Sequence, residues 1–210
     1  MEAEPPVAAS LFGDRIEVAR DFAHELGSRG EELGLIGPLE ADRLWSRHIL
    51  NCVLPAPLLR PGLVGDIGSG AGLPGLVLAI ARPDVSFVLV EPMERRVDWL
   101  REESARLGLL NVTVERARAE DAPLIEQLDQ VTARAVSALS KLIPITAQLV
   151  KRGGELVFMK GARVGDEVTA AAKQIRAARL RDARPARSST AAGSRRSWPA
   201  PRPARACRVS

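Results

Sequence analysis

Glycines at alternate positions follow an acidic residue in the segment 66–75, Asp-Ile-Gly-Ser-Gly-Ala-Gly-Leu-Pro-Gly. Gly68, Gly70 and Gly72 lack side chains, so the backbone of this turn can approach a ligand closely. Asp66 stands two residues before the first glycine, where its carboxylate can anchor the turn or accept a hydrogen bond from a ligand amine. The segment therefore predicts a turn that binds a nucleoside.

A second acidic residue, Glu91, follows the next apolar run, Val-Ser-Phe-Val-Leu-Val at 85–90. At the carboxyl end of a neighbouring strand, its carboxylate could accept hydrogen bonds from both ribose hydroxyls of an adenosine. The two motifs together predict an adenosyl cofactor.

The glycine spacing is compatible with two adenosyl cofactors, NAD and S-adenosylmethionine. Gly70, Gly72 and Gly75 also fit the G-x-G-x-x-G pattern of NAD enzymes, so the glycines alone discriminate poorly. Pro74 stands where a helix should begin, as expected for its first residue. Asp66 ahead of the glycines, with Glu91 ending the second strand, resembles the class I methyltransferases that bind S-adenosylmethionine. We expect S-adenosylmethionine and keep an NAD-dependent oxidoreductase as the alternative.

Two kinds of methyl transfer are disfavoured by missing motifs. The chain lacks the Asn/Asp-Pro-Pro-Tyr/Phe motif of exocyclic amine methylases and contains no tyrosine. Neither cysteine follows a proline in a motif that could present a thiolate to a pyrimidine ring. A target that needs no covalent activation fits better.

Strands and helices alternate in the part of the chain that carries these motifs. This pattern predicts a doubly wound α/β fold with a parallel sheet. Residues 10–60 show helical spacing of apolar residues and predict a helical cap. We expect strands over 63–67, 85–91, 111–115, 131–136 and 155–160, the last after a turn at Gly153-Gly154. We expect helices over 73–82, 93–108 and 138–150. The predicted organisation is a cap over 1–60, a methyltransferase domain over 61–182 and a basic tail over 183–210.

The positive net charge of the chain comes from its C-terminal segment, residues 173–210. Residues 1–172 hold 19 Lys and Arg against 25 Asp and Glu, whereas residues 173–210 hold 11 against 1. Beyond about Ala183 the sequence is rich in Arg, Ala, Pro and Ser, so we expect disorder there and missing or altered final strands of the sheet. Such a mixture also arises when GC-rich coding DNA is read out of frame, which is a second hypothesis for this terminus.

Composition indicates one cytosolic catalytic domain. The 210 residues are 46% hydrophobic, enough for one substantial core, and no run reaches the roughly 20 apolar residues of a membrane span. Cys52 and Cys207 lie too far apart for a metal-ligand motif. We expect a monomer in the cytoplasm with no membrane association and no metal.

Five motifs in order resemble the RsmG (GidB) family between about Leu11 and Val168. The family methylates N7 of a guanine in 16S ribosomal RNA. The resemblance implies a Rossmann-like class I fold behind the expected helical cap, and 16S ribosomal RNA or the small ribosomal subunit as the substrate. The motifs are Arg47-His48-Ile49-Leu50-Asn51, the segment 66–75, Glu91-Pro92-Met93-Glu94-Arg95-Arg96, Arg118-Ala119-Glu120-Asp121 and Ala133-Arg134-Ala135-Val136.

The resemblance implies a set of cofactor contacts. Gly68 and Leu73 would line the cofactor loop, and Glu91 would hold the ribose. Ala119 and Glu120 would flank the adenine. Arg134 would lie beside the methionine end or the target base, at the edge of the sheet where open α/β folds bind ligands.

Guanine N7 carries a free lone pair on the major-groove edge of the base, so no proton must be removed before methyl transfer. Catalysis then depends on in-line placement and electrostatics, and good orientation alone can contribute roughly 7 to 11 kcal/mol. Arg134 and Lys160 are the candidates to donate to guanine O6 or to a phosphate. Neither is expected to act as an acid or a base.

Four residues are candidates for RNA contact, each with a structural alternative. Arg47 and His48 could face the RNA, although His48 lies in an apolar helical context that equally suits a packed histidine. Arg95 and Arg96 open a helix and could be ordinary solvated surface. Trp45 and Trp99 are expected in the core. A further alternative for the whole chain is an inactive RNA-binding remnant of such an enzyme.

Overall fold

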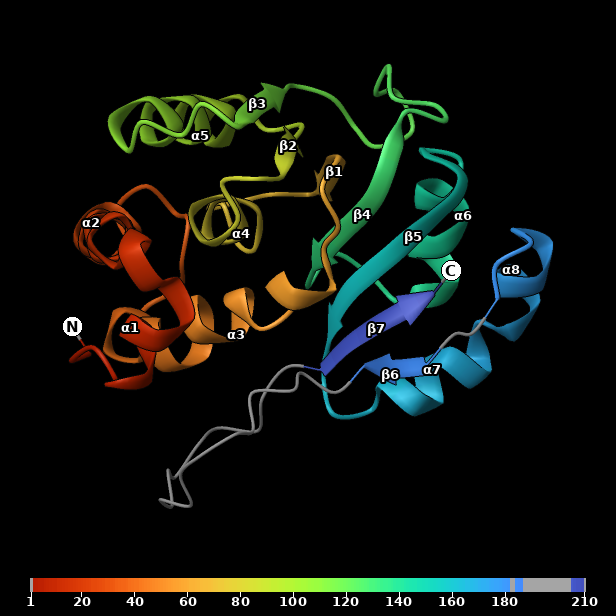
Figure 1. The fold of residues 1–210 in the computed structure, drawn as a ribbon, viewed down its shortest axis with the longest axis horizontal. Coiled ribbons are helices and arrows are strands. Elements are labelled where there is room, and N and C mark those ends of the chain that lie inside the picture. The colour runs from red at the N-terminus through yellow and green to blue at the C-terminus, as the bar shows by residue number, and fades with distance from the viewer. Residues whose placement is uncertain (1, 182–183, 187–204, 210) are drawn as a thin grey trace.

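The computed structural model describes residues 2–181, 184–186 and 205–209. Within them, seven strands form one sheet in the order β3-β2-β1-β4-β5-β7-β6 (Figure 1). The first five are parallel, and β7 runs antiparallel to both β5 and β6. The strands are β1 (Leu63–Ile67), β2 (Ser86–Val90), β3 (Val112–Glu115), β4 (Leu128–Arg134), β5 (Val150–Lys160), β6 (Arg184–Ala186) and β7 (Arg205–Val209).

The central strands β1, β2 and β4 are mostly buried because helices cover both faces of the sheet, as is typical of parallel sheets. β1 lies between β2 and β4, so the chain builds the sheet outward in one direction through β3 and then in the other direction from β4. The predicted doubly wound α/β fold is confirmed. In such sheets ligands bind at the carboxyl ends of the strands that flank this reversal.

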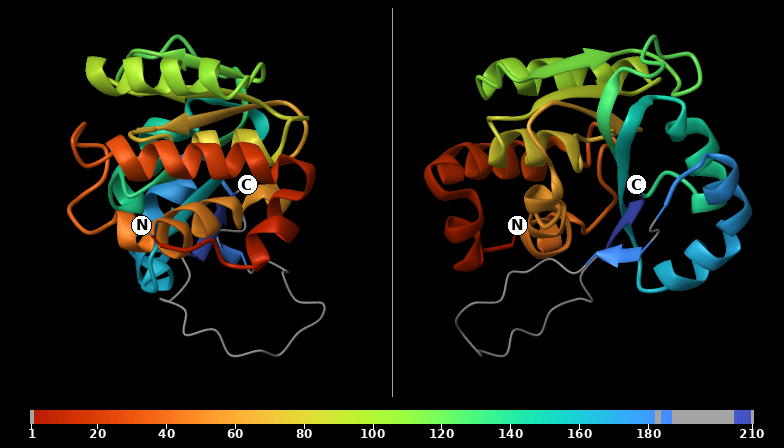
Figure 2. Two further views of the ribbon diagram at one scale, coloured as in Figure 1. Left: turned by 90° about the vertical axis from the view of Figure 1, so that its left-hand side faces the viewer. Right: turned by 45° about the vertical axis from the view of Figure 1, so that its right-hand side comes forward.

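Helices cover both faces of the sheet (Figures 1 and 2). The cap helices, α4 and α5 pack on one face, and α6, α7 and α8 pack on the other. The α-helices are α1 (Val7–Phe12), α2 (Ile16–Arg29), α3 (Leu50–Val53), α4 (Gly75–Ala81), α5 (Glu94–Arg106), α6 (Leu139–Ala147), α7 (Val164–Ala170) and α8 (Ala172–Ala177). Shorter turns are η1 (Gly13–Arg15), η2 (Ala41–Arg43), the π-helical η3 (Leu44–Ile49) and η4 (Ala56–Leu58).

The cap shares its hydrophobic core with the sheet domain. Phe22, Leu26 and Leu44 of the cap are fully buried in the same cluster as Leu76 and Leu78 of α4. α1, α2 and α3 all contact α4, the helix that follows the glycine turn. The cap is therefore packed directly behind the segment that carries the glycine motif.

Most predicted elements are found, and one boundary differs markedly. β5 begins at Val150 instead of 155, and the predicted helix over 138–150 ends at Ala147. The Gly153-Gly154 pair lies inside β5, where the pairing with β4 shifts between Leu128 and Gln130. Glycines that indicated a turn therefore mark an irregularity within a strand.

The prediction that no strand follows Lys160 is wrong. β7 pairs with β5 from Leu156 opposite Val209 to Lys160 opposite Arg205, so β5 is not an exposed edge. The expectation of disorder likewise fails for 184–186 and 205–209, while residues 187–204 lie outside the described part. A short edge strand needs backbone pairing more than branched side chains, and composition does not reveal that pairing.

Candidate cofactor and target site

A cavity of about 380 Å³ opens at the carboxyl ends of β1, β2 and β4. Its size falls in the usual range for small-molecule sites. The lining comes from four parts of the fold: the cap (Leu35), the glycine turn (68–71 and Leu73), the start of α5 with the residues before it (Glu91, Pro92, Arg96), and the end of β4 with the two residues after it (134–136). The reversal of strand order thus places the cavity where the sequence predicts a ligand.

Glu91 is a buried carboxylate in the wall of this cavity, with 2% of the residue exposed. One of its oxygens accepts from Gly70 N–H at 2.9 Å and the other from Met93 N–H at 3.0 Å. The two bonds clamp the carboxylate between the glycine turn and the start of α5. Because each carboxylate oxygen can accept more than one hydrogen bond, Glu91 keeps acceptor capacity for ligand hydroxyls.

The glycine turn leaves a cradle beside Glu91. The N–H groups of Gly68 and Ser69 both donate to Val90 O, which ties the turn to the end of β2. Gly70 has φ of +56°, and a Cβ built there would meet no atom closer than 3.9 Å. A Cβ on Gly68, in contrast, would lie 2.9 Å from Cγ2 of Val136. The turn is thus open at Gly70 and closely packed at Gly68.

Asp66 anchors the turn instead of facing a ligand. Its Oδ2 accepts from Gly75 N–H at 3.0 Å, and the residue is fully buried outside the cavity lining. Burial raises the pKa of Asp66 to about 7, although hydrogen bonds from Ser69 and Gly75 oppose this shift. The sequence predicts Pro74 as the first residue of this helix. In the structure α4 starts at Gly75, and Pro74 is its N-cap residue.

Three other predicted cofactor residues do not line the cavity. Gly72 packs against α4, where an added Cβ would lie 2.4 Å from Cδ1 of Leu76. Ala119 is half-buried against the opposite face of the sheet, and Glu120 is exposed. Gly68, Gly70, Leu73, Glu91 and Arg134 are the predicted residues that the structure brings together in the lining.

Arg134, the last residue of β4, lies in the cavity wall and contacts the cap. Its guanidinium donates to Cys52 Sγ at 3.0 Å and to Nδ1 of His48. His48 Nε2 in turn contacts Glu40 Oε2 at 2.6 Å. A line of polar contacts therefore runs from the cap to the end of β4.

The four candidate RNA contacts separate into different environments. His48 is only 8% exposed and has partners at both ring nitrogens, which agrees with the alternative of a packed histidine. The Arg47 side chain is 49% exposed and lies 3.3 Å from Glu40. Arg95 is exposed, whereas Arg96 is half-buried in the cavity lining.

Lys160 supports the loop that follows β4 and does not line the cavity. Its side chain is 11% exposed, and Nζ donates to Ser137 O at 2.7 Å and pairs with Glu167 at 2.8 Å. Glu167 also accepts from Leu139 N–H at 3.2 Å, at the start of α6. The candidate role of Lys160 in contacting the target therefore has no support from its position.

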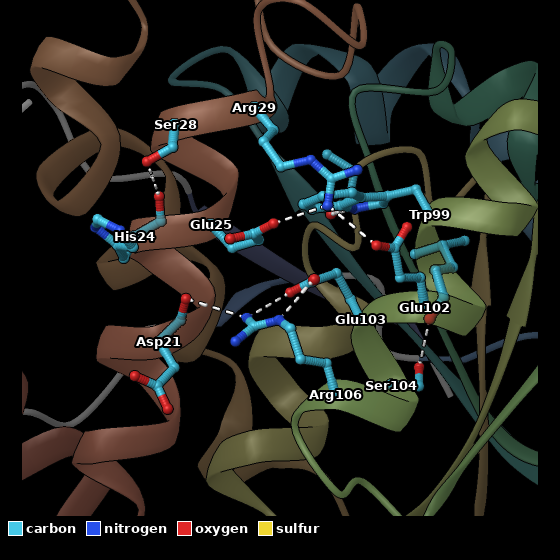
Figure 3. Close-up of polar contacts among 12 residues, drawn as sticks. Asp21, His24, Glu25, Ser28, Arg29, Trp99, Glu102, Glu103, Ser104 and Arg106 are labelled. Carbon is cyan, nitrogen blue, oxygen red and sulfur yellow. Dashed lines mark hydrogen bonds and ion pairs between the residues drawn. The ribbon is translucent and has the colours of Figure 1, made fainter.

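Trp99 is a contributor to the site that sequence reasoning placed only in the core. Its burial is as predicted, but its Nε1–H also donates to Ala71 O in the glycine turn at 3.1 Å. The Arg29 guanidinium lies 5.7 Å from the centre of the Trp99 ring and bonds Glu25 and Glu102, a bridge between α2 and α5 (Figure 3). The sequence carries no signal for these contacts, since a tryptophan on a buried helical face indicates packing alone.

The described part of the chain holds neither a metal-binding cluster nor a membrane-spanning helix. No group of three or more His, Cys, Asp or Glu side chains there is arranged to hold a metal ion. None of its helices has the length and apolar content needed to cross a membrane.

Solved structures with low sequence identity share this fold. The chain aligns with a SAM-dependent methyltransferase from Aquifex aeolicus at a TM-score of 0.53 and 18% identity, over 80% of this chain and 90% of that one. It also aligns with TYW2 from M. jannaschii, solved in complex with AdoMet, at a TM-score of 0.55 and 17% identity, over 77% and 73% of the two chains. These likenesses show the Rossmann-like methyltransferase fold.

Sequence relatives are much closer. A Clavibacter sepedonicus protein named ribosomal RNA small subunit methyltransferase G is 72% identical over 182 residues, 87% of this chain and 86% of the relative. A Corynebacterium glutamicum protein of the same name is 48% identical over 83% of this chain and 80% of the relative. The family model described as rRNA small subunit methyltransferase G matches residues 15–192. The chain belongs to this family, the GidB family of small-subunit rRNA methyltransferases.

Proposed function

We propose that this protein transfers a methyl group from S-adenosylmethionine to N7 of a guanine in 16S ribosomal RNA. The observation that carries the proposal is the clamped carboxylate of Glu91 beside the open cradle at Gly70, in a member of this family. We further propose that the protein acts as a cytoplasmic monomer on the RNA or on the small ribosomal subunit.

The cavity residues fit S-adenosylmethionine. When bound, this cofactor supplies an electrophilic methyl group on a sulfonium centre. Glu91 would accept from the ribose hydroxyls, because the bonds from Gly70 and Met93 hold its oxygens in the cavity wall. The space where a Gly70 side chain would stand leaves room for the nucleoside. Leu73 contributes apolar lining next to it.

The chemistry at the target requires placement and no proton removal. Guanine N7 already has a lone pair, so the residues around it need only hold the base in line and exclude water. Arg134 stands at the end of β4 with guanidinium N–H groups available to donate to guanine O6 or to the methionine carboxylate. Val136 and Leu35 supply apolar surface at the same cavity.

We propose that the RNA approaches over Arg47, Arg95 and Arg96. Arg95 is exposed one residue before Arg96, and its guanidinium lies against Gly34 of the cap segment that also provides Leu35. Arginines around a cavity can neutralise phosphates even where the protein as a whole is not basic. Replacing these arginines by uncharged residues should weaken RNA binding and reduce its salt dependence.

Replacing Glu91 by alanine tests the cofactor part of the proposal. Hydrogen bonds to a charged group contribute about 1.5–3 kcal/mol each, so calorimetry should show S-adenosylmethionine affinity reduced at least tenfold. Glu94→Ala, which removes a carboxylate 67% exposed on α5, is the matched control and should leave affinity unchanged. Equal affinity of wild type and Glu91→Ala would contradict the proposed site.

The RNA part is tested by mass spectrometry of 16S ribosomal RNA from cells with and without the gene. Loss of one N7-methylguanosine, restored by the wild-type gene and not by Glu91→Ala, is the expected result. An unchanged N7-methylguanosine content would show that this chain does not perform the reaction.

A further inference from the structure

The contacts of His48 define the protonation state of its ring. A guanidinium has N–H donors and no acceptor, so the ring nitrogen that meets Arg134 must be the unprotonated one. Nδ1 is therefore an acceptor. In the neutral ring the proton then resides on Nε2, which faces Glu40 Oε2 at 2.6 Å.

We propose that His48 is a positioning residue for methyl transfer: as the neutral Nε2–H tautomer, it accepts from Arg134 and donates to Glu40, and so fixes the guanidinium in the cavity wall. This inference rests on the proposed function of the cavity. It assigns the histidine of the cap to the orientation of Arg134 and not to the binding of RNA.

The surroundings of His48 favour the neutral ring. Burial lowers the pKa of His48 below its ordinary value, and the nearby charge of Arg134 lowers it further, while the contact with Glu40 opposes both effects. Arg47, the other cation close to the ring, acts in the same direction as Arg134. A protonated ring would place an N–H against the guanidinium and break the contact.

Cys52 is the second cap residue that accepts a hydrogen bond from the Arg134 guanidinium. It follows His48 by four residues, so one face of the helical segment η3–α3 presents both side chains to the guanidinium. Burial raises the pKa of the Cys52 thiol to about 11, so the sulfur is a neutral, weak acceptor. With one N–H of Nη1 and one of Nη2 engaged, the remaining N–H bonds of Arg134 are left for the cavity.

Nitrogen NMR of the imidazole tests the tautomer without any measurement of activity. The chain has only two histidines, and His24→Gln removes the exposed one, so the remaining signals belong to His48. At neutral pH we expect an unprotonated Nδ1 and a protonated Nε2. A protonated Nδ1, or the averaged signals of two exchanging tautomers, would overturn the proposal.

A pair of amide variants separates the two contacts. In His48→Asn the amide oxygen can take the place of Nδ1 and accept from Arg134, whereas His48→Gln is suited to keep the donor toward Glu40 but not the acceptor. We expect kcat/KM for RNA to fall about tenfold in His48→Gln and clearly less in His48→Asn, at similar melting temperatures. Equal losses in both variants would contradict a role through Nδ1.

A double-mutant cycle tests whether His48 acts through Arg134. If it does, His48→Gln in an Arg134→Gln background should reduce kcat/KM little beyond Arg134→Gln alone. A double variant in which the two losses of kcat/KM multiply would overturn the proposal. Failure of the proposed function itself is distinguishable, because wild type and His24→Gln would then show no methyl transfer at all.

Discussion

The indole Nε1–H of Trp99 donates a hydrogen bond of 3.1 Å to the backbone oxygen of Ala71. α5 thereby supports the glycine turn through this contact. The Arg29 guanidinium over the same ring extends this support to α2 of the cap. The cap thus reaches the site twice, through Trp99 at the glycine turn and through His48 at Arg134.

Replacing Trp99 by phenylalanine should loosen the turn while preserving most of the packing. Loss of one hydrogen bond costs about 1 kcal/mol of unfolding free energy, and a more mobile turn should weaken S-adenosylmethionine binding several-fold in calorimetry. Trp45→Phe is the control, because Trp45 is also buried but belongs to η3 of the cap and does not line the cavity. Equal cofactor affinity in the two variants would show that the contact with Ala71 does not shape the site.

Gly70→Ala should strongly weaken cofactor binding with only a modest loss of stability. The new Cβ would occupy the open space at Gly70, which is part of the cavity lining, and a positive φ costs alanine about 1–2 kcal/mol. Gly108→Ala is the control, because Gly108 has a similar positive φ of +63°, has open space around it and does not line the cavity. We expect similar melting temperatures for both variants and a cofactor affinity reduced at least tenfold for Gly70→Ala alone. Normal cofactor binding by Gly70→Ala would contradict the proposal that the nucleoside occupies the open space at Gly70.

Asp66 should make the folded state less stable as the pH rises. Its pKa is about 7 when folded against an ordinary value of 3.8, so the folded state holds a proton that the unfolded state has released. The stabilisation is complete below pH 3.8 and is lost as the pH approaches and passes 7. Each unit of pKa difference corresponds to about 1.4 kcal/mol, so the free energy of unfolding should fall by about 2–3 kcal/mol between pH 5 and 8.

Denaturant unfolding of wild type and Asp66→Asn across this pH range checks the prediction. Asparagine cannot ionise, so the stability of wild type relative to the variant should decrease from pH 5 to pH 8. Asp98→Asn, at an exposed position on α5, should show no such trend. A constant difference between wild type and Asp66→Asn would mean that Asp66 does not titrate in this range.

Val209→Asp should strongly destabilise the protein. Val209 is fully buried in the core of the face covered by α6 and stands opposite Leu156 of β5. An unpaired carboxylate there should cost at least about 3 kcal/mol, measured as a lower denaturation midpoint. Thr113→Asp on the opposite edge strand, at an exposed position, is the control. An unchanged midpoint would favour a terminus without a structural role, as reading out of frame would produce.

The parallel part of the fold was predictable because its signals are local. Apolar runs ending in Ile67 and Val90, with glycines and helical periodicity between them, identify each element without its neighbours. β7 was missed because its pairing with β5 is a long-range backbone interaction. The start of β5 was missed because glycines inside an irregular strand resemble a turn.

The fold class, the nucleoside-binding motif and the family could all be predicted from the order of the residues. Glycine spacing and the positions of Asp66 and Glu91 are properties of the chain. The folded molecule was needed to show that Asp66 faces inward, that Lys160 supports a loop, and that His48 meets Arg134 across 86 residues. Side-chain direction and burial depend on which segments pack together, and no local pattern encodes that packing.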